Sequence, residues 1–552
     1  MAVLGATDAA QLAARHYDLV IVGAGINGAA IAREAALRGL SVAVLERADI
    51  GSGTSSWSSR LIHGGLRYLE HGELRLVHES LHDRERLLQI APHLVKPLGF
   101  VVPIYRHNHK PGWMFRIGMV LYDALSSGKS LPRHRSIGKK AAAVELSSLD
   151  PDGLTGGLHY YDGQVEYAER LVLETLLSAV ESGATVQTYA AVEEITCASG
   201  RATGVRYTDL TTGAEHTVSA EVVVNAAGPW LDELAGLVSL ERMVGGTKGA
   251  HLVVDPFPGA PAECIYYEAR SDNRAVLVIP WNDRYLIGTT DERFTGDPGT
   301  VAADEDDVDY LIRETNALIP SAGLSRESVL FTYAGVRPLP YRPDGSTGDI
   351  PRSHLILTHP QVERLVSIVG GKLTPHLSLG VQTVDVVAKL LGVSTQPSHA
   401  DTTALPGAAD QWLAVATQLA DELRAQGVPD VVIRRLIKVY GARCRQLIDL
   451  IRRDPAAGRV IGEGRDAVLT AEIDIAIRGE GATHLTDLLH RRTMVGLEPD
   501  LGRSVDREVA EAAAPLMGWD SADIDCEVRA HREYVEQRLR GGLQPARDTV
   551  PA

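Results

Sequence analysis

The chain has 552 residues, with 71 acidic and 55 basic side chains and a net charge of −16. A chain this long exceeds one hydrophobic core, so we expect two or three domains. The acidic excess disfavours nucleic acid as a partner, and also simple electrostatic attraction to anionic lipid. No apolar run reaches the ~18 residues that span a bilayer, and residues 1–16 lack a secretory signal pattern. We therefore expect a cytoplasmic protein, or one on the inner face of the membrane.

A glycine turn follows the first predicted strand. Residues 17–22 are mostly apolar and lead into Gly23, Gly25 and Gly28, a G-x-G-x-x-G pattern, and then a helix ending near Arg38. In a dinucleotide site the first glycine permits the turn, the second lets backbone approach a pyrophosphate, and the third allows the helix to pack closely. The pattern predicts a dinucleotide site.

A second strand supports this interpretation. Residues 41–45 are followed by Glu46, 18 residues beyond Gly28, close to the spacing at which a carboxylate binds an adenosine ribose. The competing interpretation is a glycine-rich turn in an ordinary α/β sheet. It is disfavoured because strand, turn, helix, strand and acid occur in the required order.

Residues 51–70 contain a run of small and hydroxyl residues that ends in H-G-G-L-R-Y. Hydroxyls and glycines suit contacts to phosphates and to a flat ring. A flexible Ser/Gly linker is the alternative, but Trp57, Leu61, Ile62 and Tyr68 favour burial.

Residues 110–122 are rich in large apolar side chains flanked by cations and aromatics. The pattern fits a helix lying at a membrane interface, and it fits a buried core or dimer helix equally well.

Later elements follow from periodicity. We expect a helix over 166–180, strands over 185–192, 204–207 and 221–228, and β-rich segments over 275–279 and 285–288. Helices are predicted over 305–318, 411–425 and 429–451.

The acidic run 304–307 is predicted to begin a helix, because acids favour the positive end of the helix dipole. It lacks the EF-hand pattern, and the four cysteines, Cys197, Cys264, Cys444 and Cys526, form no C-x-x-C pair. We expect no metal site and no redox dithiol.

Several motifs together identify a family resemblance. Residues 58–71, 335–339 and 370–374 resemble the FAD-dependent glycerol-3-phosphate dehydrogenases of the aerobic, respiratory type; further similar stretches are 225–230, 248–251, 278–281 and 287–291. The similarity runs from about residue 17 to 374 and continues more weakly around 489–493.

The resemblance implies an α/β fold with FAD as cofactor. It comprises a discontinuous FAD-binding Rossmann-like domain of the glutathione-reductase/D-amino-acid-oxidase type, a β-rich substrate cap and a C-terminal all-helical domain. We assign an N-terminal tail to 1–16, the FAD-binding domain to 17–104, 150–245 and 335–400, the cap to 105–149 and 246–334, and the helical domain to 401–552.

Oxidation of a secondary alcohol requires a proton acceptor, and a phosphate requires cationic anchors. By resemblance, Arg67 and Arg337 bind phosphate or substrate oxygens, Lys372 contacts substrate and developing flavin charge, and His63 is the general base. A substrate hydroxyl with lowered pKa and solvent as proton acceptor would serve as well as His63. Lys248 is a further candidate for substrate binding.

The predicted cofactor contacts come from the glycine turn, the hydroxyl run and the later motifs. They are Gly23, Gly25, Asn27, Gly28, Glu46, Arg47, Thr54, Ser55, Ser58, Ser59, Leu61, His63, Gly64, Gly65, Leu66, Ala191, Val192, Ala227, Gly228, Trp230, Arg337, Gly371, Lys372, Leu373 and Thr374.

One position departs from the family pattern. After Thr374 this chain has Pro375 and His376, where the family commonly has a hydroxyl residue and an aromatic. We expect Thr374 to cap a helix that starts here, with its N-terminus near the flavin.

The resemblance implies oxidation of sn-glycerol 3-phosphate to dihydroxyacetone phosphate, with electrons passing through FAD to a quinone. The expected partners are substrate, quinone, the inner membrane surface and a second copy of the chain in a homodimer. The alternatives are an oxygen-using oxidase of the same fold, an FAD enzyme acting on an amine or amino acid, and a flavin-binding protein without turnover.

Overall fold

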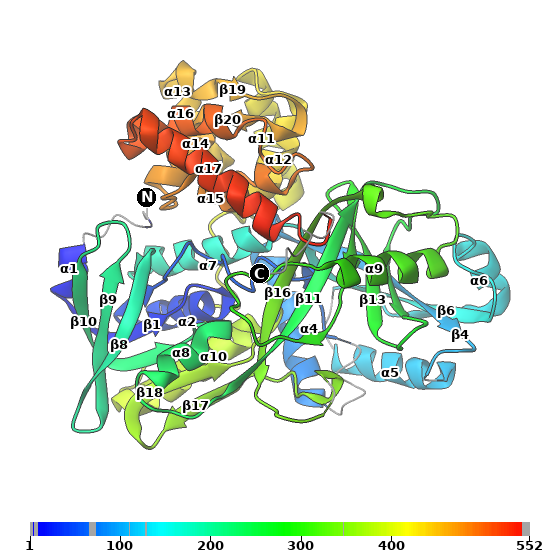
Figure 1. The fold of residues 1–552 in the computed structure, drawn as a ribbon, viewed down its shortest axis with the longest axis horizontal. Helices are drawn as coiled ribbons and strands as arrows, with labels where there is room; N and C mark the ends of the chain where they lie inside the picture. The colour runs from blue at the N-terminus through cyan, green and yellow to red at the C-terminus, as the bar shows by residue number, and fades with distance from the viewer. Residues whose placement is uncertain are drawn as a thin grey trace, which may run out of the picture.

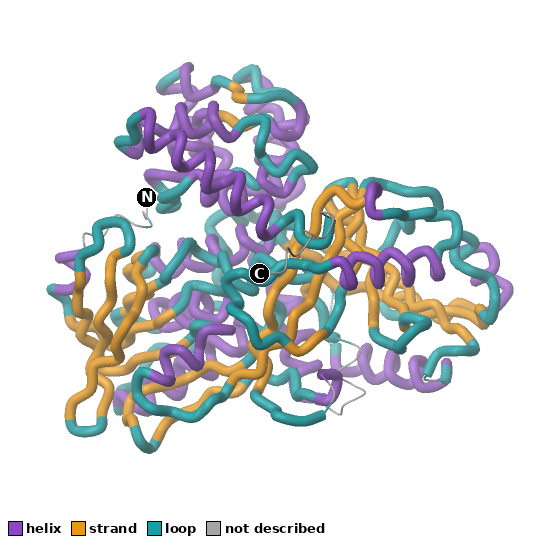
Figure 2. Tube along the Cα trace, in the orientation of Figure 1, coloured by secondary structure: helices purple, strands orange, loops and turns teal. Residues whose placement is uncertain are grey.

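The computed structural model describes residue 4 and residues 9–65, 73–109, 111–126, 128, 130–345 and 347–543. Two large β-sheets lie side by side, with a helical domain above them in the view of Figure 1. Figure 2 shows strands concentrated in the two lower parts and helices in the upper part. The predicted division into a Rossmann-like domain, a β-rich cap and a C-terminal helical domain is confirmed.

The first sheet has eight strands in the order β17-β18-β9-β10-β1-β2-β7, with β8 paired to β9. Strand β1 runs parallel to both β2 and β10, and β8, β9 and β10 form an antiparallel meander. Every residue of β2 is buried, as expected for a parallel strand covered on both faces. The strands are β1 (His16–Val22), β2 (Val42–Leu45), β7 (Thr185–Gln187), β8 (Ala190–Ala198), β9 (Arg201–Asp209), β10 (Glu215–Asn225), β17 (Leu355–His359) and β18 (Val362–Val369).

Three helices pack together on this sheet and share its apolar core: α2 (Ile26–Leu37), α7 (Ala168–Glu181) and α10 (His376–Leu391). The short helices α1 (Ala9–Ala13) and α8 (Leu231–Gly236) contact β10. Helix α7 begins two residues later than the helix predicted over 166–180.

The second sheet has ten strands in the order β15-β11-β14-β13-β12-β4-β6-β3, with β16 paired to β11 and β5 paired to β6. Its strands are β3 (Leu61–Ile62), β4 (Val95–Tyr105), β5 (Arg135–Gly138), β6 (Leu154–Val165), β11 (Val244–Val254), β12 (Cys264–Glu268), β13 (Ala275–Trp281), β14 (Arg284–Gly288), β15 (Glu292–Arg293) and β16 (Val329–Pro340). Strands β3, β4, β6 and part of β16 lie in ranges that we assigned to the FAD-binding domain, so the chain passes between the two sheets more often than predicted.

Helices surround this second sheet: α4 (Leu74–Ile90), α5 (Gly112–Leu125), α6 (Lys139–Glu145) and α9 (Glu305–Leu318). Helix α9 has the predicted bounds. The Asp304 side chain accepts a hydrogen bond from the Asp307 backbone N–H, which confirms the acidic run as a helix cap.

Helix α5 carries the segment predicted as an interfacial or buried helix. Its inward side buries Phe115, Met119 and Tyr122. Its outward side exposes large apolar residues, with Ile117 and Val120 each 61% exposed; the others are Trp113, Met114 and Leu121. The helix is therefore not buried within one copy of the chain.

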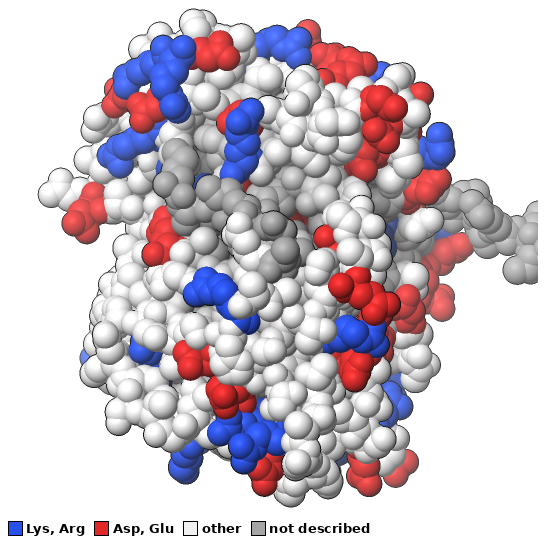
Figure 3. Space-filling view, turned by 90° about the vertical axis from the view of Figure 1, so that its left-hand side faces the viewer, with Lys and Arg blue, Asp and Glu red and all other residues white. Residues whose placement is uncertain are grey.

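No helix in the described ranges is both long and apolar enough to cross a bilayer. Figure 3 shows the end of the molecule that carries the eight-stranded sheet, where acidic and basic side chains are interspersed. Among the described residues of this face there is no continuous basic patch of the kind that binds nucleic acid.

The C-terminal domain contains α11 (Trp412–Ala425), α12 (Asp430–Tyr440), α13 (Cys444–Arg453), α14 (Thr470–Arg478), α15 (Leu485–Asp487), α16 (Asp506–Met517) and α17 (Ser521–Arg538), with a two-stranded sheet of β19 (Val460–Ile461) and β20 (Val468–Leu469). The helix predicted over 429–451 is broken in two. Gly441 adopts φ +56°, and a Cβ there would lie 2.2 Å from the Gly407 carbonyl oxygen. The chain turns at this point because only glycine fits the close approach.

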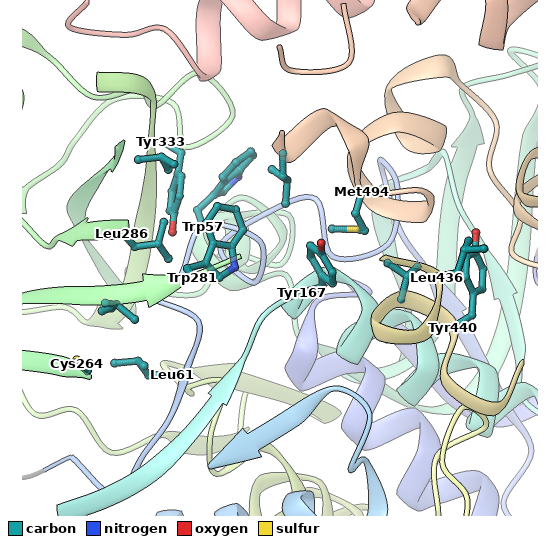
Figure 4. Close-up of a cluster of buried hydrophobic side chains, with 14 of the residues drawn as sticks. Trp57, Leu61, Tyr167, Cys264, Trp281, Leu286, Tyr333, Leu436, Tyr440 and Met494 are labelled. Atoms are coloured by element: carbon teal, nitrogen blue, oxygen red, sulfur yellow. The ribbon is translucent and has the colours of Figure 1, made fainter. Parts of the chain in front are cut away.

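A large buried cluster joins the cap to the C-terminal domain. Trp57, Trp281 and Tyr333 lie at one end of this cluster in Figure 4, and Met494 and Tyr440 lie at the other. Because the cluster is continuous, the helical domain is packed onto the rest of the molecule rather than tethered by a linker alone.

Candidate functional site

One cavity of about 990 Å³ lies where the two sheets and the C-terminal domain meet. Ligand pockets commonly enclose roughly 300–1,000 Å³, so this cavity is at the large end of that range. Its walls include the glycine turn, the loop 51–59, strands β11 and β16, the segment 370–374 and helix α17.

The glycine turn has the geometry that the sequence predicts. Gly23 adopts φ +109°, and a Cβ there would lie 2.7 Å from the Ala226 carbonyl oxygen. A Cβ on Gly28 would lie 1.9 Å from the Gly23 carbonyl oxygen, so Gly28 serves helix packing and does not line the cavity. Gly25 precedes α2 and lines the cavity, which places a helix N-terminus at the cavity wall.

Glu46 follows β2 and lines the cavity beside this turn. Its carboxylate accepts hydrogen bonds from the backbone N–H groups of Ala24, at 2.7 Å, and Ala48, at 3.0 Å. Burial raises the pKa of Glu46. A carboxylate has about four lone-pair sites, so the same oxygens can also accept ribose hydroxyls.

The loop 51–59 supplies hydroxyls along the cavity. Ser55 accepts a hydrogen bond from the Ile26 N–H at 3.0 Å, and Thr54 donates to the Val336 carbonyl at 2.6 Å. Ser59 lies 2.8 Å from Nε2 of His251. These contacts hold the loop against both the glycine turn and the second sheet.

Two buried polar atoms at the wall support the fit of a dinucleotide. Within the described structure, Oδ1 of Asn27 and Nε1 of Trp230 have no hydrogen-bond partner. Both residues line the cavity. Because buried polar atoms are normally satisfied, these two are well suited to bond a ligand such as FAD.

Most predicted cofactor residues line this one cavity. They are Gly23, Gly25, Asn27, Glu46, Arg47, Thr54, Ser55, Ser58, Ser59, Leu61, His63, Gly65, Ala191, Val192, Ala227, Gly228, Trp230, Arg337, Gly371, Lys372, Leu373 and Thr374. Gly28 and Gly64 lie behind the wall, and Leu66 and Arg67 are outside the described residues.

A group of charged side chains lines another part of the cavity. The Asp291 carboxylate lies between two guanidinium groups, accepting from Arg337 Nη1 at 3.1 Å and from Arg352 Nη2 at 3.1 Å. Lys372 lines the same cavity. These four side chains carry an excess of two positive charges, which suits a dianionic ligand.

His63 lies at this cavity, and the Thr374 hydroxyl accepts a hydrogen bond from its backbone N–H at 3.0 Å. Burial lowers the pKa of His63; the Asp162 carboxylate opposes this shift and Lys372 adds to it. The imidazole is therefore held in its neutral, proton-accepting form near neutral pH.

The position of Thr374 corrects one prediction. Helix α10 starts at His376, and its N-cap residue is Pro375, which offers no side-chain cap. Thr374 does not cap the helix, because its hydroxyl instead holds the His63 backbone.

The neighbour of His63 is fixed by a buried network. The Gly64 N–H donates to the Tyr122 hydroxyl at 2.9 Å, and that hydroxyl donates to Asp162 at 2.5 Å. Arg84 donates to the same carboxylate, also at 2.5 Å. Since Tyr122 belongs to α5, this surface helix is bonded directly to the loop beside His63.

Lys248 lies outside the cavity, contrary to its prediction as a substrate contact. Side chains alternate faces along β11, so Gly249 and His251 line the cavity while Lys248 points to the opposite face. There its ammonium group lies 2.8 Å from Asp307 and also pairs with Asp304.

Sequence reasoning missed His251, Arg352 and Arg274, which all line the cavity. His251 stacks on Tyr333, and burial, with help from Arg337 and Arg60, lowers its pKa to about 3. Strand alternation could have favoured His251 over Lys248. The positions of Arg352 and Arg274 carried no comparable signal.

The C-terminal domain also contributes to the wall, which the sequence did not predict. Its lining residues are His484, Thr486, Asp487, Arg491, Glu527, Ala530, Tyr534 and Arg538. The last four lie at helical spacing, so one face of α17 runs along the cavity.

Comparisons with known proteins identify relatives over almost the whole chain. Residues 18–391 match the family described as FAD dependent oxidoreductase, and residues 398–524 match the C-terminal domain of alpha-glycerophosphate oxidase. A glycerol-3-phosphate dehydrogenase of Synechocystis sp. is 42% identical over 537 residues, covering 94% of this chain and 96% of that protein. Glycerol-3-phosphate dehydrogenase 2 of Mycobacterium tuberculosis is 35% identical over 545 residues, covering 97% and 91%.

A solved structure is similar over almost the whole chain. It is the glycerol-3-phosphate dehydrogenase from Bacillus halodurans complexed with FAD, with a TM-score of 0.79 and 25% identity, and the match covers 98% of this chain and 97% of that one.

Proposed function

Because this chain belongs to the FAD-dependent glycerol-3-phosphate dehydrogenase family, we propose that it oxidises sn-glycerol 3-phosphate to dihydroxyacetone phosphate and passes the electrons to a quinone. The observation that carries the substrate assignment is the cationic group at the cavity wall. Arg337 and Arg352 flank Asp291, and Lys372 lines the same cavity.

The phosphate is bound by this cationic group. Asp291 orients both guanidinium groups, and Arg337 is also held by the Thr289 hydroxyl at 2.9 Å. Guanidinium groups fixed in this way present immobile positive charges to a phosphate, so little side-chain entropy is lost on binding. Glycerol lacks the phosphate that this cationic group binds, so we expect it to bind weakly.

The reaction removes a proton from the substrate hydroxyl and a hydride from the carbinol carbon. FAD, when bound, supplies the hydride acceptor. His63 accepts the hydroxyl proton in its neutral form, and Lys372 places positive charge where negative charge develops. Arg67 of the H-G-G-L-R motif is retained as a further proposed phosphate contact.

The names of the relatives and of the C-terminal domain are compatible with two electron acceptors, a quinone and oxygen. The relatives are named dehydrogenases, whereas the matched C-terminal domain is named for an oxidase. We favour a quinone because α5 offers an apolar surface through which a lipid-dissolved acceptor becomes accessible. Oxygen is the alternative acceptor.

Helix α5 is proposed to rest on the inner face of the cell membrane. Its exposed residues Trp113, Ile117 and Val120 supply the apolar side of an interfacial helix, and exposed Arg116 supplies a cation. The hydrogen bond from the Gly64 N–H to the Tyr122 hydroxyl connects this helix to the loop beside His63. The competing role for α5, contact between two copies in a homodimer, predicts instead that its substitution changes the oligomeric state.

Product formation tests the substrate assignment. The FAD-loaded protein is incubated with an electron-accepting dye and sn-glycerol 3-phosphate, glycerol or glycine, and dihydroxyacetone phosphate is measured. We expect dye reduction with the phosphate ester alone. Oxidation of glycine would favour an amine or amino-acid oxidoreductase, and no reduction despite bound FAD would favour a non-catalytic flavin-binding protein.

The acceptor is tested separately. Substrate-reduced protein is mixed rapidly with a soluble quinone or with oxygenated buffer, and reoxidation is followed at the flavin band. Fast reoxidation by quinone and slow reoxidation by oxygen support the proposal. The reverse order would identify an oxidase.

A further inference from the structure

We propose that the C-terminal domain holds the adenosine end of the FAD cavity through Asp487, Arg491 and Arg492, so that FAD retention depends on how this domain is docked. The inference rests on FAD as the cofactor and is independent of the substrate and of the electron acceptor.

Residues of the C-terminal domain lie at the predicted adenosine end of the cavity. Glu46, Arg47 and Ala48, which follow β2, line the cavity where the G-x-G-x-x-G pattern predicts the adenosine. Asp49 continues this segment and also lines the cavity, as do Asp487 and Arg491 of the C-terminal domain.

Within the described ranges, the hydrogen bonds to the Asp49 carboxylate come from the C-terminal domain. Arg491 Nε donates to its carboxylate at 2.5 Å, and Arg492 donates through two nitrogens at 2.8 Å and 2.7 Å. Burial would raise the pKa of Asp49, yet the two arginines lower it to about 2. The carboxylate therefore stays ionised, and the backbone three residues beyond Glu46 is fixed by charge-assisted hydrogen bonds.

The second wall of the same end is held through Tyr189. Its hydroxyl donates to both carboxylate oxygens of Asp487 at 2.8 Å, and Arg491 Nη2 donates to that carboxylate at 2.6 Å. The Tyr189 backbone N–H donates to the Ala48 carbonyl at 3.2 Å. Tyr189 directly precedes β8, whose Ala191 lines the cavity, so one network spans both walls.

An irregular turn of helix makes this arrangement feasible. Leu488–Arg492 is a π-helical turn, closed by a hydrogen bond from the Thr493 N–H to the Leu488 carbonyl at 2.9 Å. It places the consecutive residues Arg491 and Arg492 on one carboxylate. Single π-turns are frequent at functional sites. This turn overlaps the 489–493 motif, which the proposed reaction does not otherwise use.

Other buried ion pairs of the same domain lack this relation to the cavity. Arg170 pairs with Glu480, and Arg435 pairs with Glu472, but none of these four residues lines it. Such pairs serve docking or stability alone. Asp487 and Arg491 differ from these pairs, because their side chains dock the domain and also form part of the cavity wall.

The test compares FAD release from three variants. Tyr189→Phe removes only the hydroxyl that bonds Asp487. Arg491→Lys keeps the positive charge but cannot contact Asp49 and Asp487 at the same time. Tyr440→Phe is the matched control, because the Tyr440 hydroxyl is buried, bonds no other described side chain or backbone group, and lies away from the cavity. Release is followed by the rise in flavin fluorescence after dilution of the holoenzyme.

We expect Tyr189→Phe and Arg491→Lys to release FAD ~3- to 10-fold faster, the scale of one lost hydrogen bond, and Tyr440→Phe to match the unaltered protein. Amide hydrogen exchange over 484–493 should also slow when FAD is added. Equal FAD release rates in all variants, whatever their melting temperatures, would overturn the proposal. An amide exchange rate over 484–493 that does not change when FAD is added would also overturn it.

Discussion

At the scale of single residues, the phosphate site depends on a carboxylate that orients two cations. One carboxylate oxygen of Asp291 pairs with Arg337 and the other pairs with Arg352, so each guanidinium group is fixed before substrate binds. Such pre-organisation affects substrate binding more than protein stability.

Conservative substitution tests this arrangement. Arg352→Lys should raise the KM for sn-glycerol 3-phosphate by about tenfold, since one charge-assisted hydrogen bond and its geometry are lost, while the flavin spectrum stays unchanged. Steady-state kinetics with the dye acceptor measures the change.

Lys248→Gln is the control for that measurement. Lys248 lies on the other face of β11, so its loss should leave KM unchanged and lower the melting temperature, because buried Asp307 loses its cation. An equal rise in KM in both variants would contradict the assignment.

The protonation of His63 gives a pH prediction. Its pKa is lowered from 6.5 by burial, so the base form is present above that folded-state pKa and is lost as pH falls through it. Flavin reduction at saturating substrate should be constant above neutral pH and decline in acid, with a midpoint below 6.5. His63→Gln should slow the step by ~10²- to 10⁴-fold and abolish this decline. Stopped-flow spectroscopy between about pH 5 and 8 checks both results. A midpoint above 7 would favour solvent or another group as proton acceptor.

At the scale of elements, α5 joins an exposed apolar surface to the loop that carries His63. Its outer face is apolar and exposed, whereas its inner face carries Tyr122, which bonds Gly64. Contact with a bilayer therefore need not disturb the residues that hold His63.

Paired substitution tests the outer face. Ile117→Gln with Val120→Gln should weaken sedimentation with phospholipid vesicles several-fold, because two exposed apolar side chains of the interfacial face are lost. The melting temperature and the dye-linked activity should be unaffected, since neither side chain is buried. A change of oligomeric state in place of vesicle binding would assign α5 to a dimer interface.

Local elements were predictable where one pattern decides them. The turn at Gly23 and Gly28 was found because steric limits on Cβ act within a few residues. Helix α9 was found because its acids, cap and periodicity agree. Lys248 was predicted at the substrate because it is a cation, and the alternation of side chains along β11 was not considered. The role of Thr374 was not predictable because its partner, His63, is 311 positions away.

At the scale of the whole molecule, the cavity is shared by parts of the chain that the sequence does not visibly connect. Asp49 and Arg491 are 442 positions apart, yet they form one buried ion pair at the cavity. Periodicity predicts that the C-terminal helices exist, but it contains no information on which loop they cover. The family resemblance covered most of the cavity and gave the C-terminal wall no role.

At this scale, one cavity is proposed to hold FAD and substrate together, with the hydride leaving the carbinol carbon. The most direct measurement is anaerobic bleaching of the flavin band by saturating sn-glycerol 3-phosphate, compared with the same ester deuterated at C2. We expect complete bleaching by both and slower bleaching by the deuterated ester, with no response to glycerol. A protein that retains FAD and is not bleached by the phosphate ester would overturn the proposed function.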